Sequence, residues 1–223
     1  MSLGASTFAL SYYFASKQRP VPCQSRAHLK SALANEPHFE KRYKGGEDGW
    51  HVSPDGSMIM VADGVGSWTK RGTDPGLFTK NMCGRAGQLY AEDYHNRDLK
   101  SILVEAVRRS PEKGSCTAVI ASLESDTLST LNLGDSGYVL YSHDPEFKQV
   151  FRSKEQQHRF NCPYQCGNHN KSAARAKPNT HTVRHNDVIV MGTDGLFDNV
   201  EDEVIFEKCI EPRVLETGDL DDL

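Results

Sequence analysis

The stretch that most constrains the fold of this chain is MIMVADGVGSW, residues 58–68, in which an apolar run stops at Asp63-Gly64. An apolar run that ends in a turn dipeptide is typical of a buried strand, and the end of a strand is a rigid position for a carboxylate. A second stretch, residues 187–197, repeats this pattern and places Asp194 after its apolar run. If the two strands lie side by side, the two carboxylates come together.

Each Asp-Gly pair alone has a simpler interpretation, because Asp-Gly is a common turn dipeptide after a strand. Together they are harder to explain as turns, since a further acidic pair, Glu47-Asp48, precedes the first strand. Crowded carboxylates repel one another, and a bound cation is the usual reason to gather them. The pattern favours a metal site. A calcium-binding β domain without hydrolytic activity remains an alternative form of that prediction.

Composition and charge exclude several classes. The chain has 223 residues and a formal net charge of -4, which suits one globular domain and gives no basic footprint for nucleic acid. No apolar run approaches the roughly 20 residues that span a bilayer, so we expect no integral membrane segment. The six cysteines are scattered, which favours reduced thiols over a disulfide framework. We expect a monomer.

Residues 1–36 allow two interpretations. They are rich in Ser and Ala and carry basic residues but no acidic residue before Glu36, as organelle transit peptides do. Alternatively, residues 8–14 are the first strand of the folded domain. In both cases we expect residues 37–223 to form the main domain.

Two helices have clear signals. Asp74 followed by Pro75 is a helix start, and Asp98 can cap a second helix whose apolar residues recur over 99–107 at helical spacing. We expect an antiparallel strand at 50–52 before the helices, further antiparallel strands after them at 116–123, 127–133, 138–141, 147–151 and 188–192, and a third helix at 202–210. This arrangement predicts an α+β fold in which helices cover sheets.

Residues 153–178 are polar and irregular, and we expect them to form an exposed flap. Within this flap, Cys162, Cys166 and His169 are spaced loosely like metal ligands. They lack a second paired half, and a closed zinc site needs four ligands, so a loop with incidental thiols is the favoured interpretation.

Four sequence blocks then occur in order: GED at 46–48, VADGVG at 61–66, GSCTA at 114–118 with LGDSG at 133–137, and GTDGLFDN at 192–199. Together they resemble the metal-dependent Ser/Thr protein phosphatases of the 2C type, the PPM family, over roughly residues 37–210. The second block looks most like the organelle-targeted branch that includes mitochondrial PTC-seven-like phosphatases. The resemblance implies a mitochondrial location, with chloroplast or cytoplasm as alternatives.

This resemblance implies a four-layer αββα sandwich of two antiparallel sheets flanked by helices, with two Mg²⁺ or Mn²⁺ ions at one edge and a third, weaker site. Asp63 matches the carboxylate that bridges the two metals, and Asp194 matches the ligand from the other sheet; both are the expected catalytic carboxylates. The full set of matched metal positions is Glu47, Asp48, Asp63, Gly64 (through its carbonyl), Asp194, and, for the third metal, Asp135 and Asp198.

The implied reaction is hydrolysis of phosphoserine and phosphothreonine in proteins by a hydroxide that bridges the metals, without a phosphoenzyme. A cysteine nucleophile at Cys83 or Cys116 is disfavoured, because neither lies in a glycine-rich phosphate loop followed by an arginine. Ser115 and Thr117 are expected to be structural.

The sequence departs from the family pattern in two places. Val65 stands where many members have a histidine, so His51, a flap histidine or a metal-bound water would have to protonate the leaving group. The phosphate-binding cation is one of Lys41, Arg42 and Lys44, which the sequence does not rank.

The second departure is at the C-terminus. Family domains continue to a strand introduced by an acidic pair, and Asp221-Asp222 lies too close to Asn199 to be that pair. We therefore expect the domain to be incomplete at its C-terminus and to lack one metal ligand. The alternative function is a truncated pseudophosphatase or phosphopeptide-binding scaffold with weak or no turnover.

Overall fold

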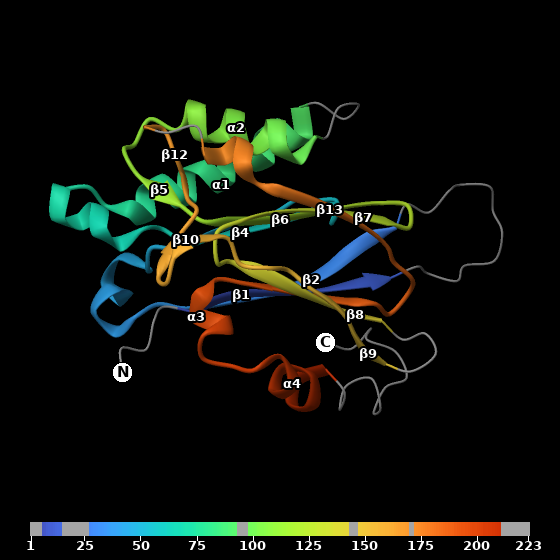
Figure 1. Cartoon of the computed structure of the whole chain (residues 1–223). Helices are drawn as coiled ribbons and strands as arrows, with labels where there is room; N and C mark the ends of the chain where they lie inside the picture. The colour runs from blue at the N-terminus through green and yellow to red at the C-terminus, as the bar shows by residue number, and fades with distance from the viewer. Residues whose placement is uncertain (1–5, 15–26, 93–97, 143–146, 170–171, 211–223) are drawn as a thin grey trace.

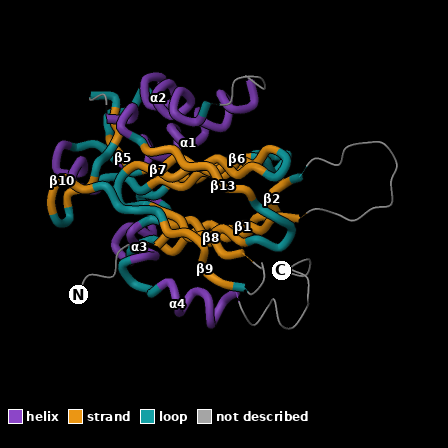
Figure 2. Tube along the Cα trace, turned by 45° about the vertical axis from the view of Figure 1, so that its right-hand side comes forward, coloured by secondary structure: helices purple, strands orange, loops and turns teal. Residues whose placement is uncertain are grey.

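The computed structural model describes residues 6–14, 27–92, 98–142, 147–169 and 172–210, and only the backbone of 6–14. Two five-stranded sheets lie face to face and helices cover the outer face of each, as Figure 1 shows. Seen from a second direction, the same four layers remain separate (Figure 2). This confirms the expected α+β, αββα architecture.

All strand pairings in both sheets are antiparallel. The first sheet has the order β2-β1-β14-β8-β9, with bounds β1 Ser6–Phe14, β2 His28–Glu36, β8 Gly137–Ser142, β9 Lys148–Arg152 and β14 Val188–Gly192. The second has the order β13-β7-β6-β4-β3, with bounds β3 Gly49–Val52, β4 Met58–Ala62, β6 Ala118–Glu124, β7 Thr127–Leu133 and β13 Lys177–Thr182.

Helices and short elements complete the described chain. The helices are α1 Pro75–Glu92, α2 Leu99–Arg109, α3 Asp194–Phe197 and α4 Asp202–Ile205, which continues into the π-helical turn η4 Phe206–Ile210. The 3₁₀ turns are η1 Phe39–Lys44, η2 Gly66–Arg71 and η3 Ser172–Arg175, and the short strands are β5 Ser115–Cys116, β10 Gln157–Arg159, β11 Cys162–Pro163 and β12 Cys166–Gly167. None of the described helices is long and apolar enough to cross a membrane.

The unbroken apolar runs of β4 and β14 follow from burial on both faces. In β4, Met58 and Met60 pack toward α1 and α2, whereas Ile59 and Val61 pack between the two sheets. In β14, alternate residues likewise divide between the inter-sheet core and the α3–α4 side. A strand covered on both faces reads as a continuous apolar run rather than an alternating one. The two runs thus mark interior strands of their sheets.

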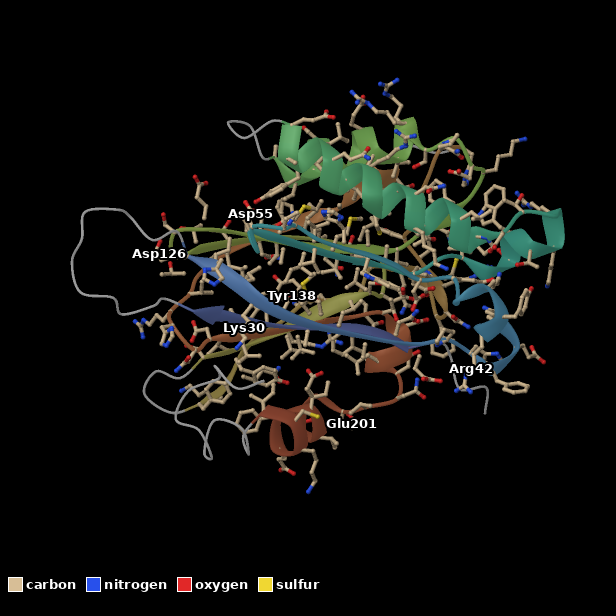
Figure 3. The ribbon with its side chains drawn as sticks, turned by 180° about the vertical axis from the view of Figure 1, so that it is seen from behind. Lys30, Arg42, Asp55, Asp126, Tyr138 and Glu201 are labelled. Atoms are coloured by element: carbon tan, nitrogen blue, oxygen red, sulfur yellow. The ribbon has the colours of Figure 1, made fainter. Side chains whose placement is uncertain are left out.

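Tyr138 ties the two sheets together through its hydroxyl group. It extends from β8 into the space between the sheets (Figure 3). Thr130 on β7 donates a hydrogen bond to this hydroxyl at 2.7 Å, and Nε2 of His181 on β13 lies 2.9 Å from it. A buried phenol needs such partners to offset the loss of water.

The helix predictions are confirmed at the residue level. Helix α1 begins at Pro75, and Asp74 accepts a hydrogen bond from the Gly76 N–H at 3.0 Å. Helix α2 begins after Asp98, and its buried face consists of Leu99, Ile102, Leu103, Ala106 and Val107.

We expect Asp98→Ala to destabilise the chain by about 1 kcal/mol, the usual cost of losing an N-cap. The Asp98 carboxylate accepts hydrogen bonds from the N–H groups of Lys100 and Ser101 at 3.4 and 2.9 Å. The Ser101 hydroxyl and these N–H groups lower the pKa of Asp98, so the loss is largest at neutral pH and shrinks as pH falls through that lowered pKa. Urea denaturation measures the difference. Asp98→Ser, which keeps an acceptor, should stay close to wild type, and an equal loss in both variants would contradict a capping role.

Three features differ from the sequence prediction. The expected strand at 116–123 is broken at Thr117 because the Thr117 N–H bonds to the Asp63 carbonyl at 3.0 Å, while Cys116 pairs with Cys166. Strands β2 and β13 were not predicted as strands at all. The β13 side chains are polar and largely exposed, so the strand carries no apolar signal.

Residues 6–14 form β1, which pairs with both β2 and β14. Whether residues 1–36 also carry a transit signal stays a prediction. The expected flap contains the β10–β11 hairpin, β12, η3 and the start of β13. Asp221 and Asp222 lie outside the described residues, so the expectation about the C-terminal acidic pair cannot be placed on the structure.

Candidate metal centre

Strand register brings together the acidic residues of the first and second blocks, and the fourth block adds Asp194 from the other sheet. Gly49 at the start of β3 pairs with Ala62 at the end of β4, so Asp48 and Asp63, the next residues along, are neighbours. Asp194 follows β14 by one residue, Thr193, and approaches from the opposite sheet. The two Asp-bearing strands, β4 and β14, thus belong to different sheets, as the family resemblance implies for Asp194. They face each other across the sandwich, and their ends still bring the carboxylates together.

Asp48, Asp63 and Asp194 line one cavity, and the charges of Asp48 and Asp194 both act on the carboxyl group of Asp63. Burial first, and then the charges of Asp48 and Asp194, raise the pKa of Asp63 well above its ordinary value. Burial and the charge of Asp198 raise the pKa of Asp194. Carboxyl groups with raised pKa values in one cleft repel one another when they ionise, and a bound cation would stabilise their ionised forms.

These groups line a cavity of about 410 Å³. The predicted residues on its wall are Glu47, Asp48, Asp63, Gly64, Val65, Asp135 and Asp194. The flap forms the opposite wall through Asn161, Cys162, Pro163 and Gln165, none of which the sequence identified as part of the site. The motif blocks gave no signal for them, because their proximity depends on how the flap folds back.

The two residues predicted for a third metal differ in position. Asp135 lines the cavity, and burial together with the nearby Asp194 charge raises its pKa to about 6. Asp198 lies at the end of α3, is exposed, and is absent from the cavity wall, although its charge reaches Asp194 and Asp135. The structure thus brings Asp135 to the site and leaves Asp198 at its border.

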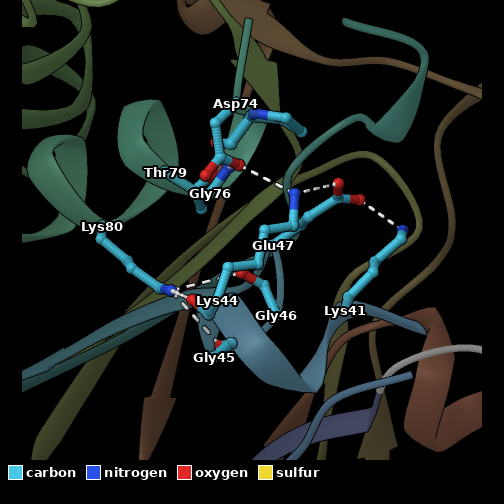
Figure 4. Close-up of polar contacts among 10 residues, drawn as sticks. Lys41, Lys44, Gly45, Gly46, Glu47, Asp74, Gly76, Thr79 and Lys80 are labelled. Carbon is cyan, nitrogen blue, oxygen red and sulfur yellow. Dashed lines mark hydrogen bonds and ion pairs between the residues drawn. The ribbon is translucent and has the colours of Figure 1, made fainter. Parts of the chain in front are cut away.

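The Glu47 carboxylate forms ion pairs with lysines and not contacts with the three aspartates. Its buried carboxylate forms ion pairs with Lys41 and, at 2.9 Å, with Lys44, which also pairs with Asp74 at 2.9 Å (Figure 4). Burial alone would lower the pKa of Lys44, but the hydrogen bonds and charges of Glu47 and Asp74 outweigh burial, so the pKa of Lys44 is raised. A buried pair of this kind needs every partner, because removing one leaves an uncompensated charge.

The turn that leads to Glu47 is fixed by Lys80 of α1. Its ammonium group donates to the carbonyls of Lys44, Gly45 and Gly46 at 3.1, 3.3 and 3.2 Å (Figure 4). Gly45 and Gly46 both have positive φ, 73° and 76°, a region that residues with side chains rarely adopt. Lys80 has no motif of its own, so the sequence alone does not identify it.

The structure ranks the three candidate phosphate-binding cations. Lys41 lines the cavity and its charge reaches Asp194. Arg42 pairs with Glu36 on the surface, and Lys44 pairs with Glu47 and Asp74. Lys41 also pairs with Glu47, but Arg42 and Lys44 are absent from the cavity wall. Among the candidate acids, His51 lies on β3 against Gly87 of α1, outside the cavity wall, and burial lowers its pKa.

The donor set fits a hard divalent cation by its chemistry. Mg²⁺ and Mn²⁺ prefer carboxylate, carbonyl and water oxygens, and Asp48, Asp63, Asp194 and the backbone at Gly64 supply the first two types. Within the described part of the chain, no group of three or more His, Cys, Asp or Glu side chains is already arranged so that it could hold a metal ion.

Comparisons with known proteins show which family this chain resembles. The family model described as "Protein phosphatase 2C" matches residues 43–219. "Probable protein phosphatase 2C 80" of Arabidopsis thaliana is 36% identical over 181 residues, which cover 79% of this chain and 43% of the relative. "Protein phosphatase PTC7 homolog fig" of Drosophila ananassae is 35% identical over 184 residues, which cover 73% of this chain and 54% of the relative.

Among solved structures, the "X-ray structure of the photosystem II phosphatase PBCP" superposes with a TM-score of 0.71 at 31% identity, covering 76% of this chain and 67% of that chain. The chain spans about half the length of the curated relatives it matches. The family match, in contrast, covers most of the chain and includes every predicted metal position. This chain belongs to the protein phosphatase 2C family.

Proposed function

We propose that this chain is the catalytic part of a Mg²⁺- or Mn²⁺-dependent phosphatase that removes phosphate from phosphoserine and phosphothreonine in proteins. The observation that carries the proposal is the placement of Asp63 between Asp48 and Asp194 on the wall of one cavity. Membership of the phosphatase family and relatives that are named as protein phosphatases support it.

Asp63, Asp48, Asp194 and the Gly64 carbonyl would hold two cations, and Asp135 with Asp198 a third. When bound, such cations activate water at neutral pH and neutralise charge on a phosphoryl group. The chain itself supplies the rest. Lys41, on the cavity wall, attracts and orients the phosphate dianion, and the Glu47 and Lys44 pair keeps the backbone before Asp48 in place.

Val65 forms part of the cavity wall where a histidine was expected from the family pattern. An apolar side chain cannot move a proton, so the leaving oxygen must receive its proton from another group in the cavity. Neither His51 nor the flap histidines His158 and His169 line the cavity within the described residues. His158 packs on Tyr164 and His169 on Trp68.

The test is metal dependence. We expect hydrolysis of an aryl phosphate and of a phosphothreonine peptide to appear with Mn²⁺ or Mg²⁺, to disappear with a chelator, and not to appear with Ca²⁺. Thermal unfolding should shift upward with Mn²⁺, because a cation that binds only the folded chain stabilises it. A stabilisation by Ca²⁺ without hydrolysis would favour the calcium-binding alternative. Peptide binding without metal-dependent turnover would favour the scaffold.

Three further properties stay proposals. We propose a monomer that acts on phosphoproteins and resides in mitochondria, with chloroplast or cytoplasm as alternatives. The composition of residues 1–36 supports an organelle, yet β1 and β2 lie in that segment and β1 is an interior strand of its sheet. Removal of all 36 residues would therefore take two strands from the fold. Imaging of residues 1–36 fused to a fluorescent protein tests the location.

A further inference from the structure

Two buried cysteines face each other at the base of the flap. Cys116 lies on β5 and Cys166 on β12, and the two residues are direct partners in the antiparallel register. Their Sγ atoms are 3.7 Å apart, and the Cys166 thiol donates to the Cys116 carbonyl at 3.5 Å. Both side chains have 0% exposure. No sequence pattern pairs these two cysteines, because 50 residues separate them.

This geometry is close to that of a disulfide. A disulfide needs a sulfur–sulfur separation of about 2.05 Å and Cα atoms roughly 4.4–6.8 Å apart. Directly opposed residues of an antiparallel pair have Cα atoms about 4.5–5.5 Å apart, which lies inside that window. The backbone is thus already in position. A rotation of the side chains about χ1 is the remaining step.

We propose that Cys116 and Cys166 are an oxidation site, at which a peroxide converts the two thiols to a reversible disulfide that fastens the flap to the strand beside the metal centre. The inference goes beyond the proposed phosphatase function and does not depend on it. It depends only on the folded chain and on an oxidant of the peroxide class.

The chemistry balances with hydrogen peroxide alone. One thiol, after losing its proton, attacks a peroxide oxygen; the O–O bond breaks and leaves a sulfenic acid and one water. The second thiol attacks that sulfur; the S–O bond breaks, the S–S bond forms, and the second water leaves with the remaining protons. Two thiols are oxidised and one peroxide is reduced to two waters, and a dithiol reductant reverses the result by exchange.

Access requires a small opening of the flap. Within the described residues, the ladder between β12 and β5 consists of two residue pairs, Cys166 with Cys116 and Gly167 with Ser115. Side-chain hydrogen bonds from Ser115 to Gln165 and from Asn168 to the Ser110 and Glu112 carbonyls add to it. So short a ladder opens locally at much lower free energy than the whole domain. Because both thiols are enclosed in the closed form, oxidation should be slower than that of the exposed Cys209.

The disulfide would act on the wall of the metal cavity. Gln165, next to Cys166, lines that cavity and accepts a hydrogen bond from the Ser115 hydroxyl. Ser115 in turn accepts from the Trp68 indole at 2.7 Å. A covalent bond between Cys116 and Cys166 would hold these contacts closed, so the flap could no longer separate from the strand that borders Asp63.

The experiment maps the bond directly in the wild-type chain. After treatment with hydrogen peroxide and alkylation of free thiols, trypsin should yield the Cys116 peptide, residues 114–148, linked to residues 160–171. Both Cys162 and Cys166 lie in the second peptide, so fragment spectra that divide it between Pro163 and Cys166 assign the partner. The thermal midpoint should rise by roughly 5 °C or more and return with a dithiol, because the cross-link restricts the unfolded chain.

Matched variants separate this pair from other thiols. Cys116→Ala and Cys166→Ala should each lose the linked peptide and the thermal shift, whereas Cys209→Ala should keep both. The direct map on wild type stands even if a variant folds poorly. A bond from Cys166 to Cys83 or Cys162, recovery of both peptides unlinked while Cys209 is oxidised, or a linked peptide without a thermal shift would each overturn the proposal.

Discussion

Asp63→Asn will reduce metal-dependent hydrolysis by at least about 100-fold and, with divalent ions chelated, will leave the chain more stable than wild type at neutral pH. Removing a group that only hydrogen-bonds to a metal ligand already lowers metal affinity or activity roughly 10–100-fold. Asp63 is itself the proposed shared ligand, so its loss should cost at least as much. The gain follows from the sign of the pKa shift. Burial and the charges of Asp48 and Asp194 raise the pKa of Asp63, so its ionisation opposes folding above the unfolded-state pKa. Asparagine removes that cost.

The measurement pairs steady-state kinetics in Mn²⁺ with urea denaturation in a chelator. Glu124→Gln is the matched control: it removes an exposed carboxylate on β6 of the same sheet and should change neither quantity. The stability advantage of Asp63→Asn should shrink as pH falls through the ordinary carboxyl pKa of 3.8, below which Asp63 is protonated in both the folded and the unfolded wild type. If Asp63→Asn keeps its turnover, or is less stable than wild type in chelator at neutral pH, Asp63 is not a metal ligand but a residue of the turn after β4.

The elements that could be predicted are those whose signal is local. Helix α2 is specified by its Asp98 cap and by apolar residues at helical spacing, and each of these residues lies where expected. The strands β4 and β14 are specified by apolar runs that end at Asp63 and before Asp194. In these segments propensity, capping and burial all favour the same structure, which is the condition under which sequence reasoning succeeds.

What could not be predicted depends on partners that are distant in the sequence. Strand β13 is polar, and only its hydrogen bonds to β7 make it a strand. The choice of Lys41 over Arg42 and Lys44 required knowing which of the three reaches the cavity wall. The repeated motif predicted that Asp63 and Asp194 come together. Neither motif alone shows which sheet carries each strand, because that depends on the topology of the whole chain.

Gly64→Ala will destabilise the chain by about 3 kcal/mol or more and will weaken Mn²⁺ binding. A Cβ at this position would lie 2.4 Å from the Glu47 carbonyl oxygen and 2.6 Å from the Thr79 hydroxyl, closer than real Cβ atoms come. Overpacking of a buried site typically costs about 1–3 kcal/mol, and here the obstructing atom is backbone and cannot rotate away. Gly64 also forms a bridge with Cys116, so a shift there would move the Asp63 carboxylate.

Urea denaturation, and a thermal-shift titration with Mn²⁺, measure the two effects. Gly84→Ala is the control, because it lies within α1 and a Cβ there would have no atom within 4 Å. An alanine at an open helical position should stabilise the chain by about 0.5–1 kcal/mol. If Gly64→Ala lowers the free energy of unfolding and Gly84→Ala raises it, glycine is required beside Asp63 because Gly64 lies so close to the Glu47 backbone, and not because glycine is flexible. Two changes of the same sign would contradict that account.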